Sequence, residues 1–373
     1  MSIEQFRISV SQDRLDRIAA KLADARIGPA PADEADWALG MSAGYLAELV
    51  EFWRTDYDWR AEEAALNRYP QYLATIDGLP IHFQHIVAPG GYPIPIVLTH
   101  GWPGSIVEFQ AVIPKLVEAG FSVVVPSLPG YGWSGRPANP VGPAYTAGLW
   151  RKLLVDVLGY PRFFAQGGDW GSMVTSWLGA NHADVVPAIH LNLFRTVLPG
   201  PDATAPLKDY WAKVGQVMAS ESAYQQLHQT RPQTIGLALH DNPVGWAAWV
   251  IEKFQRWSDS NGNIESRFTK GQLITNLMTY LTTDSVMSSI WFYYGNTRES
   301  KLLLPLKVPT GLAAYPGEFL PVPDRDLAQL AYNVEHYATM AAGGHFAAME
   351  VPDIFAADIL AFFTPRAGKT ISA

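Results

Sequence analysis

Short apolar runs and amphipathic stretches alternate along residues 72–196, and this alternation predicts strands that are connected by helices. A hairpin is expected at the start, because Asp77 and Gly78 separate two β-prone runs. Strands connected through helices form a mostly parallel central sheet with helices on both faces, so the predicted class is α/β. The predicted strands are 72–76, 81–87, 94–99, 121–125, the run that ends before Asp169, and 185–191, with helices at 106–118 and 144–158.

After residue 196 the apolar positions follow helical spacing, and strand-like runs return near residue 308. A helical block between two parts of a strand-containing core predicts an inserted helical lid. Strands are expected again at 308–315 and 335–340, and an amphipathic helix is expected at 352–363. The predicted lid helices are 207–218, 222–228, 232–239, 243–257, 270–282 and 285–294.

The first 71 residues contain two amphipathic helical patterns among aromatic-rich segments, such as that around Trp59, which are expected to be irregular. Ser11 can cap the first helix, and the second is expected at 42–55. Such short helices cannot bury their aromatic neighbours alone, so we expect an N-terminal helical meander that packs over the core and lid; an independent small helical domain is the alternative. The predicted organisation is 1–71 meander, 72–196 first half of the core, 197–304 lid and 305–373 second half of the core.

Composition limits the class of protein without defining its function. Apolar residues make up 48% of the 373 residues, which is enough for a globular core, and the net charge is -8 without a basic stripe. We therefore expect no nucleic-acid partner. Cysteine is absent, and no apolar run is long enough for an export signal or a spanning helix. The sequence thus predicts a soluble, cytoplasmic protein without disulfides or a thiolate metal site.

Residues 162–172 contain the first candidate for chemistry. An apolar, β-prone run leads into Gly167-Gly168-Asp169-Trp170-Gly171, after which the pattern becomes helical. A strand, a sharp turn and a helix form a nucleophile elbow, where side chains at the flanking glycines would clash. The residue at the tip is Asp169, and a carboxylate, with a reference pKa of about 3.9, can attack carbon without a base to deprotonate it. The expected target is an sp3 carbon that bears a leaving group.

His100-Gly101-Trp102-Pro103-Gly104 directly follows the strand predicted at 94–99. The carboxyl ends of the strands form the site in doubly wound sheets, so this loop is expected beside the elbow. The backbone amides of Trp102 and Trp170 are therefore the predicted oxyanion hole for a tetrahedral intermediate.

A base and an acid are expected after the lid, because nucleophile, acid and histidine follow one another in this order in enzymes with such an elbow. His345 follows Gly343-Gly344, and these glycines allow its imidazole to reach toward Asp169. Glu318 ends the preceding strand and is the expected partner that orients the imidazole. The competing acids are Asp324, Asp326 and Glu335, and the histidines interpreted as structural are His82, His85, His190 and His240.

With these motifs the chain resembles the epoxide hydrolases of the α/β-hydrolase fold, and among them the microsomal type, which includes the juvenile hormone epoxide hydrolases. The resemblance extends from Phe6 onward. The Asp-Trp-Gly tripeptide alone is shared with haloalkane dehalogenases, whereas the complete set of motifs is specific. The set comprises His100-Gly101-Trp102-Pro103-Gly104, Gly167-Gly168-Asp169-Trp170-Gly171-Ser172, Asn242-Pro243-Val244-Gly245 and Gly343-Gly344-His345-Phe346-Ala347-Ala348.

The resemblance implies a two-step hydrolysis that needs no cofactor. Asp169 would open the epoxide and become an alkyl ester, and His345 with Glu318 would activate the water that hydrolyses this ester. The resemblance also implies that two lid tyrosines, Tyr224 and Tyr293, donate to the oxirane oxygen, since phenols with a reference pKa of about 10 are protonated at neutral pH. The neighbouring tyrosine at position 294 is the rival for the second role.

The implied reactants are water and a small hydrophobic epoxide, and the aromatic lid predicts an apolar or aryl substrate. Membrane-bound members of the family carry an apolar anchor before the meander, whereas Met1 stands almost directly in it, so no membrane anchor is expected. The sequence does not define the oligomeric state, and a homodimer is one assembly that it allows. The alternatives are a haloalkane dehalogenase, which would not need paired phenols, and a lapsed hydrolase that only binds a hydrophobic ligand.

Overall fold

The computed structural model describes residues 3–31 and 37–368, so residues 1–2, 32–36 and 369–373 of the predicted meander and second core half lie outside the described residues. Within the described part, nine strands form one sheet in the order β1-β2-β3-β5-β4-β6-β7-β8-β9. The pairs from β1 to β5 are antiparallel and those from β5 to β9 are parallel, which confirms the mostly parallel sheet. The strands are β1 (Ile3–Phe6), β2 (Gln71–Ile76), β3 (Leu79–Ile86), β4 (Ile96–Thr99), β5 (Val123–Pro126), β6 (Phe164–Gly167), β7 (Ile189–Leu191), β8 (Pro309–Ala314) and β9 (Asn333–Thr339).

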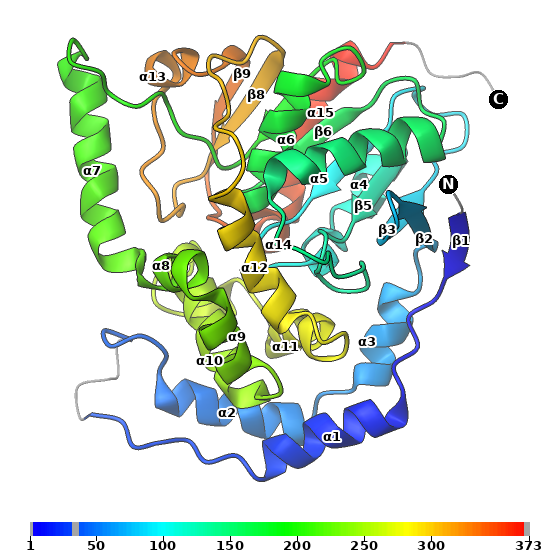
Figure 1. The fold of residues 1–373 in the computed structure, drawn as a ribbon, viewed down its shortest axis with the longest axis vertical. Coiled ribbons are helices and arrows are strands. Elements are labelled where there is room, and N and C mark those ends of the chain that lie inside the picture. Colours follow the sequence, from blue (N-terminus) through cyan, green and yellow to red (C-terminus); the bar gives the residue numbers. More distant parts are fainter. Residues whose placement is uncertain (1–2, 32–36, 369–373) are drawn as a thin grey trace.

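The sheet separates two apolar cores, because successive residues of a strand point to opposite faces. In β4, Val97 packs into one core, whereas Ile96 and Leu98 pack into the other. Helices α5 and α6 cover the first face, and α4 and α15 cover the second, as Figure 1 shows. The helices of the core are α4 (Ile113–Glu118), α5 (Pro143–Arg151), α6 (Asp169–Asn181), α13 (Arg325–Gln329), α14 (Ala347–Glu350) and α15 (Pro352–Phe363).

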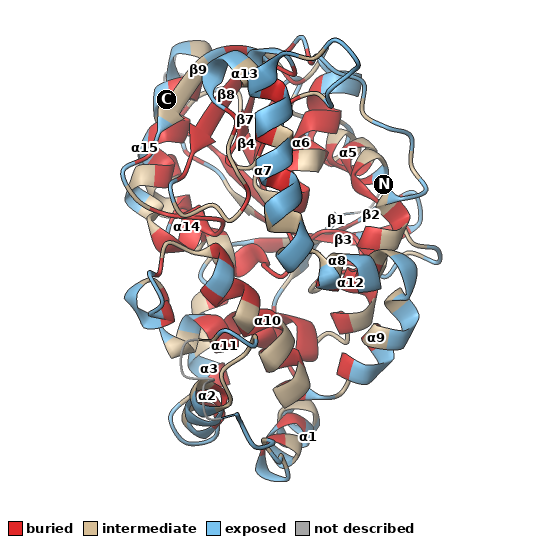
Figure 2. Cartoon of the chain, turned by 90° about the vertical axis from the view of Figure 1, so that its left-hand side faces the viewer, coloured by how far each residue is buried: buried red, intermediate tan, exposed pale blue. Residues whose placement is uncertain are grey.

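The chain between β7 and β8 forms a helical block, called the lid below; in Figure 1 most of its helices lie below the sheet, and α7 stands to the left of it. Figure 2 shows that buried residues gather in the sheet and on the inner sides of these helices, whereas α7 is exposed along most of its length. No helix in residues 3–31 and 37–368 combines the length and the apolar character needed to cross a bilayer. The helices of the block are α7 (Ala205–Glu221), α8 (Ala223–Thr230), α9 (Pro232–Leu239), α10 (Pro243–Trp257), α11 (Lys270–Leu281) and α12 (Val286–Asn296).

The N-terminal segment contributes α1 (Gln12–Ala23), α2 (Ala43–Thr55) and α3 (Trp59–Leu66). Ser11 caps α1 as expected, since its side chain accepts a hydrogen bond from the amide of Arg14. The irregular structure expected around Trp59 is wrong: Asp58 accepts bonds from the amides of Arg60 and Ala61 and so begins α3.

Strand β1 was also not predicted, and it pairs antiparallel with β2 at the edge of the sheet. On its other side the segment contacts the helical block, where Arg17 of α1 pairs with Asp241 at 2.5 Å and Arg14 pairs with Asp284. The N-terminal segment therefore contacts both the sheet and the lid.

Two predicted helices of the core are interrupted. The helix expected at 106–118 divides into a 3-10 helix, Ile106–Phe109, and α4, which has a proline in its first turn. Proline lacks the amide proton that a continuous helix requires, and it is tolerated only in such a first turn. The helix expected at 144–158 continues from α5 into a π-helical stretch, Lys152–Val157.

Candidate active site

Asp169 lies on a strained turn between β6 and α6. Its φ angle of +46° is in the left-handed region, which is unfavourable for a residue with a side chain. A Cβ atom on Gly167 would lie 2.1 Å from the carbonyl oxygen of Gly171, and one on Gly171 would lie 1.9 Å from that of Thr99. The two glycines therefore permit the close approach of the backbone that an elbow needs.

The loop after β4 reaches the carboxylate of Asp169. The amide of Trp102 donates a hydrogen bond of 2.8 Å to Asp169 Oδ1. Trp170 is the second residue of α6, and amides of the first helical turn have no acceptor within their own helix. Of the two amides proposed from the sequence, that of Trp102 contacts the carboxylate in space, and that of Trp170 follows Asp169 along the chain.

His100 helps to hold this loop in place. Its Nδ1 lies 2.9 Å from the carbonyl oxygen of Gly101, and its Nε2 accepts a hydrogen bond from the amide of Leu128 at 3.1 Å. Burial lowers its pKa to about 4, so the imidazole is neutral at pH 7 and both ring nitrogens are occupied. His100 is therefore a structural residue of the site.

His345 lies between two carboxylates. Its Nδ1 is 3.0 and 3.1 Å from the two carboxylate oxygens of Glu318, and its Nε2 is 3.3 Å from Asp169 Oδ2. The side chains of His345 and Glu318 are only 2% and 1% exposed. Burial by itself lowers the pKa of His345, but the charges and hydrogen bonds of Glu318 and Asp169 outweigh it and hold the pKa well above its ordinary value.

The competing acids are engaged elsewhere. Asp324 is exposed and caps α13 by accepting a hydrogen bond of 2.9 Å from the amide of Leu327. Asp326 is exposed, and Glu335 pairs with Arg366 at 2.5 Å. The structure therefore brings Glu318, and not these three acids, to His345.

Tyr224 of α8 and Tyr293 of α12 face the elbow from the lid. The ring of Tyr224 stacks on Trp102 with centroids 5.4 Å apart, and the ring of Tyr293 meets Trp170 edge-on at 4.7 Å. The two phenol rings are 5.9 Å apart. Burial is the main cause that raises the pKa of both phenols, and the charge of Asp169 raises both further, so both stay protonated at neutral pH.

The structure distinguishes Tyr293 from its neighbour. Tyr293 is 2% exposed, and its hydroxyl interacts with that of Tyr224. The hydroxyl of Tyr294 accepts a hydrogen bond of 3.0 Å from Arg298 on the outer side of α12. Tyr293, and not Tyr294, therefore lies with the other predicted site residues.

Glu108 is a residue of the site that the sequence analysis missed. A small cavity beside the elbow is lined by Glu108, Asp169 and His345. Burial, with a contribution from the charge of Asp169, raises the pKa of Glu108 to about 8, while the charge of His345 opposes this shift. The only sequence signal is that Glu108 lies four residues after Gly104. This spacing does not indicate whether its side chain points toward the elbow.

The lid holds both loops of the site. Asn276 of α11 donates a hydrogen bond of 2.7 Å to the carbonyl oxygen of Pro103, and the hydroxyl of Tyr280 donates to that of Gly104. At the end of α10, the carbonyl oxygen of Trp257 accepts a hydrogen bond of 2.9 Å from the amide of His345. These contacts fix the lid relative to the loops that bear Trp102 and His345.

The described residues offer a nucleophile, a base and protonated donors. The carboxylate of Asp169 can attack carbon, His345 can exchange a proton with water, and the two phenols can donate to an oxygen that gains negative charge. No group of three or more metal-binding side chains converges in this part of the chain.

Comparison with known proteins identifies the family of this chain. Residues 3–109 match the family model described as epoxide hydrolase N terminus, and residues 94–216 match the model described as alpha/beta hydrolase fold. Epoxide hydrolase 1 of Oryctolagus cuniculus is 34% identical over 97% of this chain and 88% of its own length.

Two solved structures cover almost the whole fold. Juvenile hormone epoxide hydrolase from the silkworm Bombyx mori has a TM-score of 0.88 and 28% identity, and the match covers 98% of this chain and 94% of that chain. Aspergillus niger epoxide hydrolase has a TM-score of 0.86 and 32% identity, and the match covers 98% of this chain and 97% of that chain.

Proposed function

Because the chain belongs to the epoxide hydrolases of the α/β-hydrolase fold, we propose that it converts apolar or aryl epoxides to vicinal diols through a covalent ester on Asp169. The main support is the position of this carboxylate. Its Oδ1 accepts a hydrogen bond of 2.8 Å from the amide of Trp102, and its Oδ2 lies 3.3 Å from Nε2 of His345. A carboxylate that is held on one side is oriented for attack before the substrate arrives.

In the first step an oxygen of Asp169 forms a bond to one oxirane carbon, and the bond between this carbon and the oxirane oxygen breaks. An alkoxide is a poor leaving group, so this oxygen must gain a proton or strong hydrogen bonds as the bond breaks. Tyr224 and Tyr293 are buried, protonated and close to the elbow, and they supply these donors. The product of this step is a hydroxyalkyl ester of Asp169.

In the second step water loses a proton to His345, and the resulting hydroxide attacks the carbonyl carbon of the ester. The amides of Trp102 and Trp170 stabilise the negative oxygen of the tetrahedral intermediate. When the intermediate collapses, the leaving oxygen of the diol takes the proton from His345, and loss of the proton left on Asp169 restores the free enzyme. Ester formation removes the negative charge of Asp169, one cause of the high pKa of His345. The pKa of His345 therefore falls when a base is needed.

We assign to Glu108 the role of binding the water molecule that reacts in the second step. Its carboxyl group lines the same cavity as His345 and Asp169. A water in this cavity can bond to both Glu108 and His345, which would place it beside the carbonyl carbon of the ester.

A haloalkane dehalogenase would use the same nucleophile, base and acid, but the relatives with similar sequences and folds do not favour it. A pure binding protein would have no use for the contacts between Asp169, His345 and Glu318 together. The cytoplasmic location, the absence of a nucleic-acid partner and a homodimeric assembly stay predictions from the sequence.

A single-turnover reaction in ¹⁸O-labelled water tests the ester route, with enzyme in excess over styrene oxide and the diol analysed by mass spectrometry. Unlabelled diol is expected, because its new oxygen comes from Asp169 in the first turnover. One of the two carboxylate oxygens of Asp169 then carries the label, so a second turnover should give partly labelled diol. Labelled diol in the first turnover would show direct hydration and would remove Asp169 as the nucleophile.

A further inference from the structure

His228 lies among the aromatic residues that surround the elbow. It is on α8, one helical turn after Tyr224, and its side chain is 0% exposed. Its ring centroid is 4.7 Å from that of Trp102, 4.7 Å from that of Tyr293 and 5.5 Å from that of Tyr224. His228 therefore touches the residues that flank the nucleophile, although the proposed reaction does not use it.

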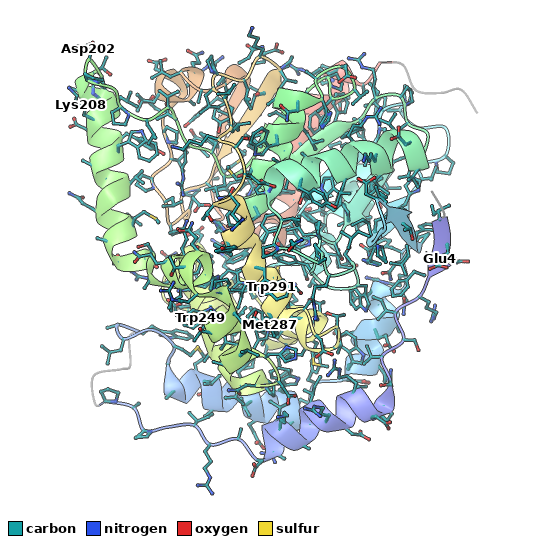
Figure 3. All side chains as sticks on the ribbon, in the orientation of Figure 1. Glu4, Asp202, Lys208, Trp249, Met287 and Trp291 are labelled. Carbon is teal, nitrogen blue, oxygen red and sulfur yellow. The ribbon has the colours of Figure 1, made fainter. Side chains whose placement is uncertain are left out.

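Trp249 determines which nitrogen of His228 carries the proton. The indole Nε1 of Trp249 donates a hydrogen bond of 3.1 Å to His228 Nε2. An indole N–H can only donate, so Nε2 must be the unprotonated acceptor, and the proton of the neutral ring is on Nδ1. Figure 3 shows Trp249 on the lid, and its side chain is partly exposed there. The lid thus fixes the tautomer from the outer side.

His228 remains neutral over the working range of an enzyme. Burial, with a smaller contribution from the charge of Lys253, lowers its pKa to about 3. Protonation would also break the bond from Trp249, because Nε2 would become a donor. The side chain therefore presents one N–H donor, at Nδ1.

This donor has no hydrogen-bond acceptor in the part of the chain that the structure describes. Two other buried histidines differ: His82 has partners 2.9 and 2.8 Å from its two nitrogens, and both nitrogens of His100 are also paired. Aromatic faces near His228 can offer only weak contacts to an N–H group. A buried donor without a partner is costly, and the position of this one beside Trp102, Tyr224 and Tyr293 makes an oxygen of the substrate its candidate acceptor.

We propose that His228 Nδ1–H donates a hydrogen bond to a second oxygen of the substrate, so that the enzyme prefers epoxides with an ether, ester or carbonyl oxygen near the oxirane. The inference rests on the proposed function and deepens it. Tyr224 and Tyr293 serve the oxirane oxygen, which leaves the N–H of His228 for another acceptor. An epoxide without such an acceptor leaves this donor unpaired, and the expected penalty is roughly 10- to 100-fold in kcat/KM.

The test compares benzyl glycidyl ether with 1,2-epoxy-5-phenylpentane, in which a methylene group replaces the ether oxygen. The measured quantity is the ratio of kcat/KM for the two epoxides. Because the ether oxygen also changes the intrinsic reactivity, the ratio of the wild type is compared with that of His228→Leu. We expect this substitution to lower the preference for the ether about 10-fold or more.

Three further variants test the origin of the preference. His228→Asn keeps an N–H donor near the position of Nδ1 and should restore part of the preference. Trp249→Phe removes the donor that fixes the tautomer, and it should lower the preference while Tyr224 and Tyr293 stay in place. Gln226→Leu, on the exposed side of α8, is the control and should keep the ratio of the wild type.

Equal ratios in the wild type and His228→Leu would overturn the inference and leave the proposed function intact, because turnover itself would continue. If His228→Leu does not fold, an unchanged ratio in Trp249→Phe would overturn the inference instead. Absence of diol from both epoxides with the wild type would overturn the proposed function and the inference together.

Discussion

The two sides of the site differ in how their polar groups are paired. On the core side, Asp169, His345 and Glu318 are charged or chargeable groups in mutual contact at 3.0 to 3.3 Å. On the lid side, the phenol of Tyr293 and the Nδ1–H of His228 are neutral donors, and no residue in the described part of the chain accepts a hydrogen bond from this Nδ1–H. The charged groups of the core side therefore have charged neighbours within the protein, whereas we expect the substrate to complete the lid side.

The cost of burial explains this difference. A buried charge without a partner is very unfavourable, so the nucleophile and the base must have partners within the protein. A neutral donor without a partner costs much less, and the cost is recovered when a substrate oxygen accepts its hydrogen bond. The comparison predicts that substitutions on the core side abolish chemical steps, whereas substitutions on the lid side weaken ring opening or substrate preference.

The largest effect is expected for Asp169→Asn. The amide is a poor nucleophile, so diol formation should fall by about 10⁴-fold or more. Steady-state assays measure this loss, and intact-protein mass spectrometry should detect no alkylated protein. Activity within 10-fold of the wild type would show that Asp169 does not form the ester.

His345→Gln separates the two steps on the core side. Ring opening does not need the base, whereas ester hydrolysis should slow by about 10³-fold. The ester should therefore accumulate, and the protein mass should increase by that of the epoxide. The double variant Asp169→Asn, His345→Gln is the control and should remain unmodified; a mass increase in it would place the ester on another residue.

On the lid side, Tyr224→Phe and Tyr293→Phe should each slow ring opening by about 10- to 100-fold, since one donor remains in each variant. Rapid-quench measurement of the alkylated protein gives this rate. Tyr294→Phe is a matched control because its hydroxyl bonds to Arg298, and it should open the ring as fast as the wild type. An equal loss in Tyr294→Phe would contradict the assignment.

Glu108→Gln should slow ester hydrolysis by about 10-fold and leave ring opening unchanged, because the amide is a weaker acceptor for the water. Burial and the charge of Asp169 raise the pKa of Glu108 to about 8 in the free protein. The carboxylate accepts a hydrogen bond from water better than the carboxylic acid, so hydrolysis should accelerate as pH rises, with a midpoint at the pKa that Glu108 has in the ester. Single-turnover rates across pH measure this midpoint, and its persistence in Glu108→Gln would exclude Glu108 as its source.

The smallest effect on activity is expected for Asp358→Asn. Asp358 pairs with His190 and His336 and is not among the site residues described above. Burial raises the pKa of Asp358, but bonds of 2.9 Å from His190 and 2.7 Å from His336, with their charges, lower it below its ordinary value. The stabilisation is present above the unfolded pKa of about 3.9 and is lost as pH falls through the lower folded pKa.

At pH 7 the Asp358→Asn variant should therefore lose about 1 to 3 kcal/mol of unfolding free energy, and the loss should shrink below about pH 4. Urea unfolding at several pH values measures both quantities. The kcat should stay that of the wild type, and a change in kcat of more than a few-fold would show that this network is coupled to the site.

Local sequence patterns predicted the central fold well and the N-terminal segment less well. The helices at 243–257 and 352–363 have their predicted bounds, because long apolar stripes define them. Strand β1 has four residues, none of them fully buried, and it exists because β2 offers a sheet edge. A strand whose partners lie 65 to 71 residues later, from Gln71 opposite Phe6 to Ala74 opposite Ile3, leaves no local signal.

The sequence by itself determined the α/β class, the elbow around Asp169, the order of nucleophile, acid and histidine, and the family. Glycine spacing and apolar periodicity are local, and they restrict the backbone wherever the chain folds. Only the tertiary structure decided which adjacent tyrosine faces the site, because neighbouring helical residues point about 100° apart. It also brought Glu108 to His345 and His228 to Tyr293, since such contacts depend on how distant segments pack.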